Sequence, residues 1–226
     1  MLRVVFIALI LFCLNKATYA MDNDNLIVPG ERVGLVNKNS TEAELLRVLP
    51  RKQVERTVYY EGEGGYRCAS KLFPNTNKEM IIVWQSDTEE IAELSNSKTD
   101  KQITQENCIK KPSFRNPEFI MLQGKTLWKT KENITVGMDL ATIENITKSP
   151  VSFNICGCDI DGNIYQGLLN KMSGHLDDQN NPNISDIYYN SDSDKKNKDI
   201  ISSDKLSKEQ KHKIFLDKIY VVFSEK

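Results

Sequence analysis

The residues best suited to catalysis are two carboxylates in a glycine-rich stretch, Glu61 and Glu63, which alternate with Gly62, Gly64 and Gly65. Two carboxylates that share one face of a strand are the arrangement used in general acid–base chemistry, including glycoside hydrolysis. In a glycine turn, however, both side chains are expected to face water. The pair therefore supports a hydrolase as an alternative hypothesis only.

The two histidines, His175 and His212, lie in polar stretches. A Ser-His-Asp or Cys-His site needs an imidazole within hydrogen-bonding reach of its nucleophile, and neither histidine has apolar neighbours that would hold it there. The sequence also lacks a phosphate-binding glycine loop, a His-Glu-x-x-His motif and a dinucleotide fingerprint. We therefore expect solvated surface histidines, no catalytic residues and no cofactor.

Two acidic runs have part of the spacing of a calcium loop. Residues 159–163 read Asp-Ile-Asp-Gly-Asn, but no bidentate Glu follows, and Asp-Gly also suits a tight hairpin. Asp192 and Asp194 are followed by Lys195 and Lys196, which would repel a cation. We predict a hairpin and a solvated loop, and no metal site.

Residues 1–20 have the pattern of a secretory signal peptide, with Arg3 before an apolar run and Thr18-Tyr19-Ala20 at its end. The run is too short to cross a bilayer, which takes about 20 residues. Without Arg3 and Lys16, 28 basic residues stand against 31 acidic ones, which excludes a basic nucleic-acid footprint. We expect a periplasmic or secreted protein without a transmembrane segment.

Four cysteines remain after the leader: Cys68, Cys108, Cys156 and Cys158. An even count in an exported chain favours one or two disulfides over redox or metal chemistry. Cys156 and Cys158 are two apart in a predicted strand, where a direct bond would be strained, so Cys68 and Cys108 are the better pair. Asn-x-Ser/Thr triplets, which mark surface in a host that glycosylates and mean nothing in a bacterium, occur at Asn39, Asn133, Asn145 and Asn183.

The elements around these residues form a repeated order of turn, helix and strand. Thr41 and Glu44 have the spacing of a capping box, and the helix that follows is stopped by Pro50 before a strand at 57–60. A second helix carries Leu140 and Ile143, followed by a strand at 151–155. The expected fold is α+β, a duplicated helix-plus-antiparallel-sheet unit that forms a single layered core.

The expected boundaries follow from composition. Residues 21–32 are a polar N-terminal segment, and residues 33–226 are one domain of two units, about 33–124 and 125–226. A polar stretch at about 174–200 predicts a mobile loop. The apolar run 218–223 predicts a terminal strand in the middle of the sheet.

Two motifs carry a resemblance. Thr-x-x-Glu-Leu after a short strand, and later Trp-Lys-Thr-x-x-x-Ile-Thr-x-Gly before the turn with Gly157, Asp159 and Gly162, resemble a family of uncharacterised exported bacterial proteins with a tandem α/β unit. Cys158 departs from that pattern, where a large aromatic residue is usual. The unit is also similar in shape to the SmpA/OmlA lipoproteins and the β-lactamase inhibitor protein. The resemblance implies an envelope or secreted protein that presents a sheet surface.

These observations favour a secreted or periplasmic, non-catalytic module that binds or inhibits another envelope or secreted protein. The alternatives are the hydrolase with a carboxylate pair at Glu61 and Glu63, and an envelope protein with no discrete ligand. The sequence leaves the ligand and the oligomeric state open.

Overall fold

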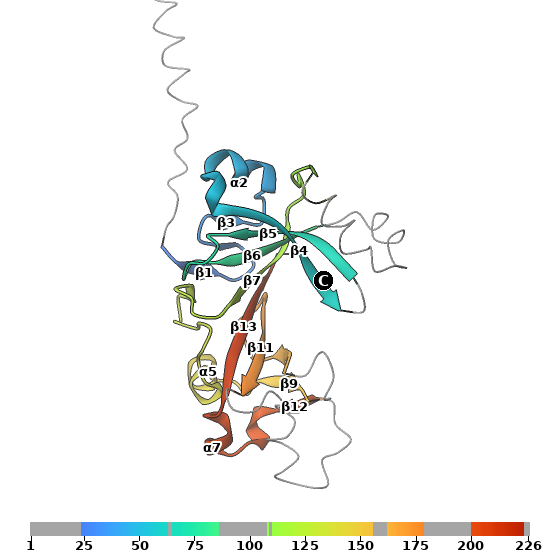
Figure 1. The fold of residues 1–226 in the computed structure, drawn as a ribbon. Coiled ribbons are helices and arrows are strands. Elements are labelled where there is room, and N and C mark those ends of the chain that lie inside the picture. The colour runs from blue at the N-terminus through green and yellow to red at the C-terminus, as the bar shows by residue number, and fades with distance from the viewer. Residues whose placement is uncertain are drawn as a thin grey trace, which may run out of the picture.

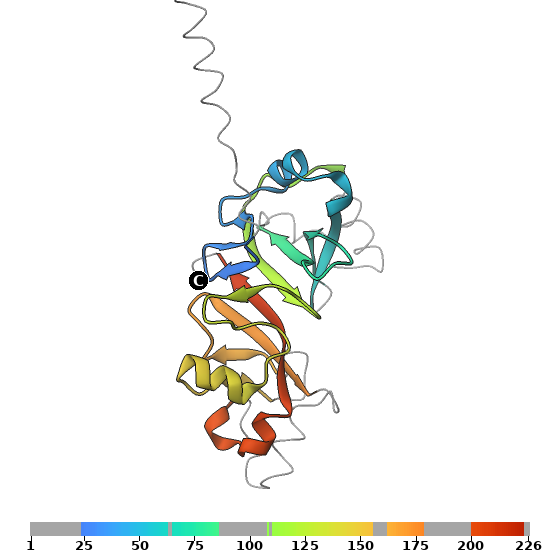
Figure 2. The same cartoon turned by 90° about the vertical axis from the view of Figure 1, so that its left-hand side faces the viewer.

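The computed structural model describes residues 24–62, 65–85, 108, 110–155, 162–178 and 200–223. Its largest element is a six-stranded antiparallel sheet with the strand order β11-β13-β7-β6-β5-β4. The strands are β4 (Val54–Gly62), β5 (Gly65–Leu72), β6 (Met80–Trp84), β7 (Pro117–Gln123), β11 (Met172–Asp178) and β13 (Ile214–Val222). Long β13 runs from the end of the molecule that carries α7 to its middle, where it pairs with β7, as Figures 1 and 2 show.

Two smaller sheets flank the large one. The first, in the order β3-β2-β1-β8, contains β1 (Leu26–Val28), β2 (Arg32–Val33), β3 (Val36–Asn37) and β8 (Lys129–Thr130), with β1 and β8 parallel. The second, in the order β10-β9-β12, contains β9 (Ser152–Asn154), β10 (Ile164–Gln166) and β12 (Ile200–Ser202). Short strands of this kind complete the core without extending the large sheet.

The α-helices of the described part are short. They are α2 (Glu42–Val48), α5 (Leu140–Thr147) and α7 (Lys208–Lys211), and two 3₁₀ turns, η1 (Arg51–Gln53) and η3 (Ser203–Lys205), accompany them. The predicted capping box of Thr41 and Glu44 is confirmed, and Ser207 and Gln210 form a second capping box at the start of α7. Pro50 limits α2 to about two turns, because the residue before a proline avoids helical geometry. Helices α2 and α7 lie at opposite ends of the molecule (Figure 1).

One apolar cluster joins all three sheets. Its largest side chains, Trp84, Trp128 and Phe153, are each at most 1% exposed. Trp128 lies against Gly34, where an added Cβ would stand 2.6 Å from the indole ring and where φ is +53°. A glycine is therefore required at this point for the first small sheet to approach the core.

The face of the large sheet that points away from this cluster carries an aromatic group of its own. The ring of Phe119 on β7 lies 5.3 Å from that of Tyr59 on β4 and 5.9 Å from that of Tyr220 on β13. Since β5 and β6 separate β4 from β7, at about 4.8 Å per strand, the rings meet only because the sheet curls towards this face. Burial raises the pKa of Tyr220 above its ordinary value, and Tyr59 and Asp217 add to the rise.

The predicted fold class is wrong: the molecule is mostly β and is not a duplicated helix-plus-sheet core. A helix followed by strands does occur after Thr41 and after Asp139, as the sequence patterns indicate. The helices are only seven and eight residues long, however, and the two sets of strands enter different sheets. Strands β4, β5 and β6 belong to the large sheet, whereas β9 and β10 belong to a small one. Pairing partners, which local patterns do not specify, decide this outcome.

The predictions for the terminal strand, the polar loop and the absence of a transmembrane helix compare with the structure as follows. The predicted terminal strand is confirmed as an interior strand, because β13 pairs with both β11 and β7, although it begins earlier, at Ile214. Strand β11 takes up residues 172–178, where the start of a loop was expected, and residues 179–199 lie outside the described part. Within the described residues, no helix is long and apolar enough to cross a membrane. The predicted leader, residues 1–20, lies outside them and remains a prediction.

Candidate binding site

A shallow pocket of about 550 Å³ opens between η1 and the turn that joins β5 to β6. We call it the Phe73 pocket. Phe73 and Pro74 give it an apolar wall, while ammonium, carboxamide and hydroxyl groups form the remainder. Its lining residues are Lys52, Gln53, Phe73, Pro74, Thr76, Asn77 and Lys78. Apolar surface combined with a few polar groups is the usual composition of a binding site.

Backbone hydrogen bonds hold the turn of the pocket on two sides. The amide of Phe73 donates to the carbonyl of Gln53 at 2.9 Å, which fixes the end of β5 to η1. On the other side, the carbonyl of Asn77 accepts from the amide of Leu127 at 2.8 Å. The indole Nε1 of Trp128, itself part of the core, donates to the carbonyl of Lys78 at 3.0 Å. The walls of the pocket are therefore preformed.

The same turn holds two residues in the left-handed backbone region, Phe73 at φ 50° and Asn75 at φ 60°. A bulky residue in this region is an outlier, and such strain costs on the order of 1–3 kcal/mol. Surrounding contacts stabilise it: the amide of Asn75 donates to Glu79 Oε2 at 2.7 Å, and Thr76 Oγ1 donates to the carbonyl of Phe73 at 2.7 Å. Phe73 also packs against the main core. Strained turns of this kind are frequent at ligand sites.

Three polar side chains of the pocket are uncommitted. Within the described ranges, the side chains of Lys52, Gln53 and Asn77 make no hydrogen bond or ion pair. Lys52 and Asn77 are exposed, and Gln53 is half-buried. Their ammonium and carboxamide groups are therefore available as donors to a ligand.

Some polar side chains elsewhere hold the fold together, and one such group surrounds the buried Glu42 of α2. Its Oε1 accepts from Arg56 Nε at 2.9 Å and from Ser70 Oγ at 2.7 Å, and its Oε2 accepts from the amide of Ser113 at 2.6 Å. Arg56 also donates to the carbonyls of Cys108 and Lys111. This network fixes α2 to β4, β5 and the segment that carries the disulfide.

A second group joins α5 to the segments near η3. Glu144 accepts from the hydroxyl of Ser203 and, at 2.7 Å, from Lys211 Nζ, while the amide of Val151 donates to Ser203 Oγ at 2.7 Å. A serine next to a carboxylate and a lysine is a combination found in nucleophilic catalysis. Ser203 is fully buried, however, and its oxygen already has partners on two sides. We therefore assign this group to structure.

Both histidines lie beside carboxylates, and they differ in how much water reaches them. His175 Nδ1 is 3.7 Å from Asp217 Oδ2, and its side chain is only 22% exposed, so the expectation of a solvated residue is wrong for it. His212 Nδ1 is 3.3 Å from Asp139 Oδ1, and its side chain is half exposed. Within the described residues, no three His, Cys, Asp or Glu side chains are grouped closely enough to hold a metal ion.

Asp139 is the N-cap of α5, and its charge is expected to stabilise the fold in a pH-dependent way. Burial would raise the pKa of Asp139, but hydrogen bonds from the amide and hydroxyl of Thr142, together with nearby His212, hold it below its ordinary value. We expect Asp139→Ala to lower the free energy of unfolding by about 1 kcal/mol at pH 7, as for a lost N-cap. Because the folded pKa is lowered, the contribution of the charge is present above the unfolded pKa, about 3.9, and is lost as pH falls through the folded value.

Urea unfolding of the Asp139 variants between pH 2 and pH 7 measures this effect. Asp139→Asn is the matched control, because asparagine caps a helix about as well as aspartate but carries no charge. It should retain most of the stability and lose the acid-dependent part. A difference between wild type and Asp139→Ala that stays constant down to pH 2 would contradict the role of the charge.

The site residues singled out from the sequence are only partly described. Cys68 and Cys108 form a disulfide, as predicted, while Cys156 and Cys158 lie outside the described residues. Glu61 continues β4, but its side chain and the whole of Glu63 lie outside them too, as do residues 159–161 and 192–196. Asn39, Asn133 and Asn145 are exposed, and Asn183 is not described.

No pattern in the sequence predicts the Phe73 pocket. Its only local signals are two prolines, Pro50 before Arg51-Lys52 and Pro74 before Asn75, each of which indicates a turn. Neither indicates that the two turns meet in space. Comparison of the chain with protein-family models, curated proteins and solved structures finds no match. The resemblance to exported bacterial proteins therefore stays a prediction, and the function has to be argued from the geometry.

Proposed function

We propose that the protein is a non-catalytic binding or inhibitory module that acts on another secreted or envelope protein, and that the Phe73 pocket is the centre of this contact. The observation that carries the proposal is that uncommitted donors lie beside an apolar wall in a preformed pocket; exposed lysines elsewhere, such as Lys208, have no such wall beside them in a described pocket. Lys52, Gln53 and Asn77 have uncommitted donors within the described ranges, while Glu42 and Glu144 are engaged in contacts that hold the fold. Groups left available on a preformed surface are the ones a partner can use.

The export of the protein is part of the same proposal. It is supported by the leader pattern at residues 1–20 and by the Cys68–Cys108 disulfide, a bond typical of oxidising compartments. The hydrolase alternative depends on Glu61 and Glu63, whose side chains are not described, and no geometric observation favours it. The envelope protein with no discrete ligand remains as an outcome of the test.

The test is a pull-down with the mature, oxidised protein from cell-envelope and culture-supernatant fractions, in which bound proteins are identified by mass. Wild type is compared with Lys52→Glu in the pocket and with Lys208→Glu as a matched control, because Lys208 is also exposed and lies on α7 at the other end of the molecule (Figure 1). We expect one stoichiometric partner with wild type and the control, and its loss with Lys52→Glu. An empty pull-down, or a partner kept by Lys52→Glu, would contradict the proposal.

A further inference from the structure

We infer that the Phe73 pocket takes a glutamate side chain from an acidic segment of the partner protein, with the carboxylate at Lys52 and the methylene groups against Phe73. This inference rests on the proposed function and adds the chemistry of the partner. Lys52 and Lys78 both line the pocket, so a carboxylate inside it is attracted by positive charge, and the exposed Lys52 is the group expected to contact it. The carboxamides of Gln53 and Asn77 can donate to the same oxygens.

The apolar wall favours a side chain with a hydrocarbon stem. Phe73 and Pro74 line the pocket next to the cationic groups. Burial of one methylene group contributes roughly 0.8 kcal/mol, so a ligand that combines a stem with a carboxylate uses both walls. A bare inorganic anion would use only the cationic side. Glutamate fits this description better than a small anion does.

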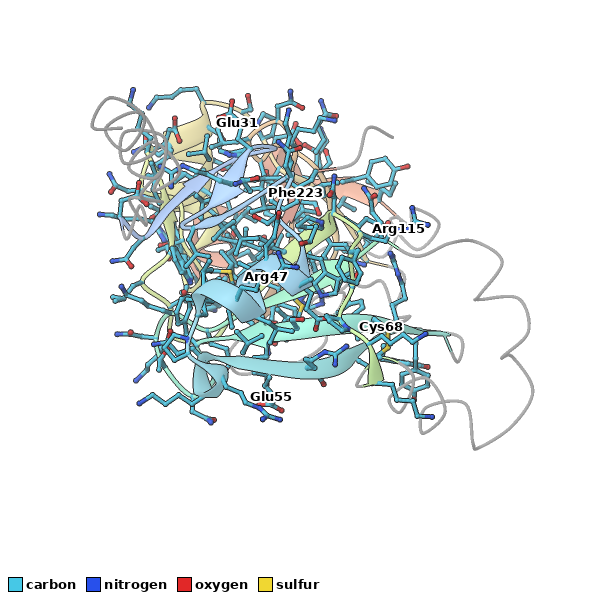
Figure 3. The ribbon with its side chains drawn as sticks, turned by 90° about the horizontal axis from the view of Figure 1, so that it is seen from above. Glu31, Arg47, Glu55, Cys68, Arg115 and Phe223 are labelled. Atoms are coloured by element: carbon cyan, nitrogen blue, oxygen red, sulfur yellow. A yellow bond between two sulfur atoms is a disulfide. The ribbon has the colours of Figure 1, made fainter. Side chains whose placement is uncertain are left out.

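Positively charged residues near the pocket could contact more of the partner than one glutamate side chain. Arg47 in the last turn of α2 and Arg51 in η1 are exposed, and Val48 between them is 52% exposed. Arg47 lies on the end of the molecule that faces the viewer in Figure 3. We call these residues and Lys52, which follow one another closely in the chain from α2 into η1, the basic ridge: Arg47, Val48, Arg51 and Lys52. An acidic segment with several carboxylates can contact more than one of them.

The acidic residues near the ridge are already engaged. Glu44 accepts from the amide of Thr41 in the capping box. Glu79 accepts from the amide of Asn75 and lies 3.8 Å from Lys71 Nζ. Glu55 on β4 lies directly opposite Lys71 on β5. These carboxylates keep their charge, but Lys71 offsets one of the three, so the three cationic groups of the ridge, Arg47, Arg51 and Lys52, remain in excess by one charge.

The full chain carries 30 Lys and Arg residues against 31 Asp and Glu residues, so attraction of an acidic partner has to come from the local cationic groups at the pocket and the ridge. An excess of one sign raises the rate at which a partner of the opposite sign associates, and salt screens this effect over a Debye length of about 8 Å at physiological ionic strength. Binding should therefore weaken as salt rises.

The test uses fluorescein-labelled peptides with the full, oxidised protein. The probe is a peptide of eight glutamates that contains one central phenylalanine, and its control is the same peptide with glutamine in place of glutamate. Fluorescence anisotropy is measured at low and at physiological salt for wild type, Lys52→Ala and Lys208→Ala. An unlabelled galacturonic acid oligomer serves as a competitor, because an acidic sugar carries the same carboxylate on a different scaffold.

We expect saturable binding of the glutamate peptide, at least tenfold weaker binding of the glutamine peptide, and about a fivefold loss of affinity with Lys52→Ala, the effect of one partly exposed charge. Lys208→Ala should bind as wild type does. Equal losses in the two lysine variants would overturn the inference, because they would show attraction by net charge alone. Tighter binding of the galacturonate oligomer than of the peptide would overturn it in favour of a glycan.

The two proposals fail in distinguishable ways. A protein partner that is captured by wild type and lost with Lys52→Glu, but not displaced by the glutamate peptide, supports the proposed function and overturns the glutamate inference. Absence of any captured partner overturns the proposed function. In that case peptide binding that depends on Lys52 would still show that the pocket accepts carboxylates, and the partner role alone would be withdrawn.

Discussion

Replacement of Glu42 with alanine is expected to lower the free energy of unfolding by roughly 3–5 kcal/mol, the cost of breaking a buried ion pair by removing one partner. The side chain of Glu42 is only 4% exposed and that of its partner Arg56 only 16%. Without the carboxylate, the Arg56 guanidinium loses its counter-charge, and the Ser113 amide loses its acceptor. Arg56 keeps its bonds to the carbonyls of Cys108 and Lys111, so the cost comes from the missing counter-charge and from the donor at Ser113 that loses its acceptor.

Urea denaturation followed by tryptophan fluorescence measures this change. Trp84 reports on the network directly, since its Nε1 donates to Ser70 Oγ at 2.9 Å and Ser70 donates to Glu42. Glu44→Ala is the matched control, because Glu44 belongs to the same helix but is exposed at the capping box. It should cost about 1 kcal/mol or less. Similar losses in the two variants would refute the importance of the buried network.

Removal of the disulfide has the second large expected effect. Cys68 on β5 and Cys108 are 40 residues apart, and closing a loop of that length is worth about 4 kcal/mol in the chain-entropy estimate. We therefore expect the double variant Cys68→Ser with Cys108→Ser to unfold at a markedly lower urea concentration than the wild type. Wild type under a strong thiol reductant should approach the same midpoint.

The comparison of oxidised and reduced protein also tests the assigned pairing. Cys68→Ser alone and Cys108→Ser alone should each be as unstable as the double variant, because each removes the same bond. A single variant that keeps wild-type stability would show that another cysteine forms the bond. Figure 3 shows the position of Cys68 on the large sheet.

The two changes should not be additive. Arg56 donates to the carbonyl of Cys108 and also to Glu42, so the ion pair and the disulfide hold the same segment against β4 and β5. Residues that share a partner couple, and the combined variant should lose less than the sum of the separate losses. Cys108, Lys111 and Ser113 are thus held both by the disulfide and by the Glu42–Arg56 network.

Local structure could be predicted from local residues. The capping boxes at Thr41 and Ser207 and the interior strand at the C-terminal end of the chain follow from spacing, because a cap involves neighbours three residues apart and a strand needs only a run of apolar β-formers. The pairing of Cys68 with Cys108 followed from the strain expected between Cys156 and Cys158. These predictions needed no knowledge of distant contacts.

The fold class and the site were decided by contacts between distant segments. Strand patterns do not state their neighbours, so the entry of β4 and β9 into different sheets could not be predicted. The Phe73 pocket exists because Gln53 meets Phe73 and Leu127 meets Asn77, contacts over 20 and 50 residues. His175 was expected in water because its neighbours in sequence are polar, yet β13 places Asp217 beside it.

Neighbouring side chains and simple geometry thus specify where α2 begins, that the apolar run at the C-terminal end is a strand, and which cysteines can pair. Only the tertiary structure decided that the chain is mostly β and that uncommitted donors gather at Lys52, Gln53 and Asn77. Strand pairing and pocket formation both join segments that are far apart in the sequence, so their free energy depends on the whole chain and not on neighbouring residues. A lysine on a turn becomes a candidate binding group only when another segment supplies the opposite wall.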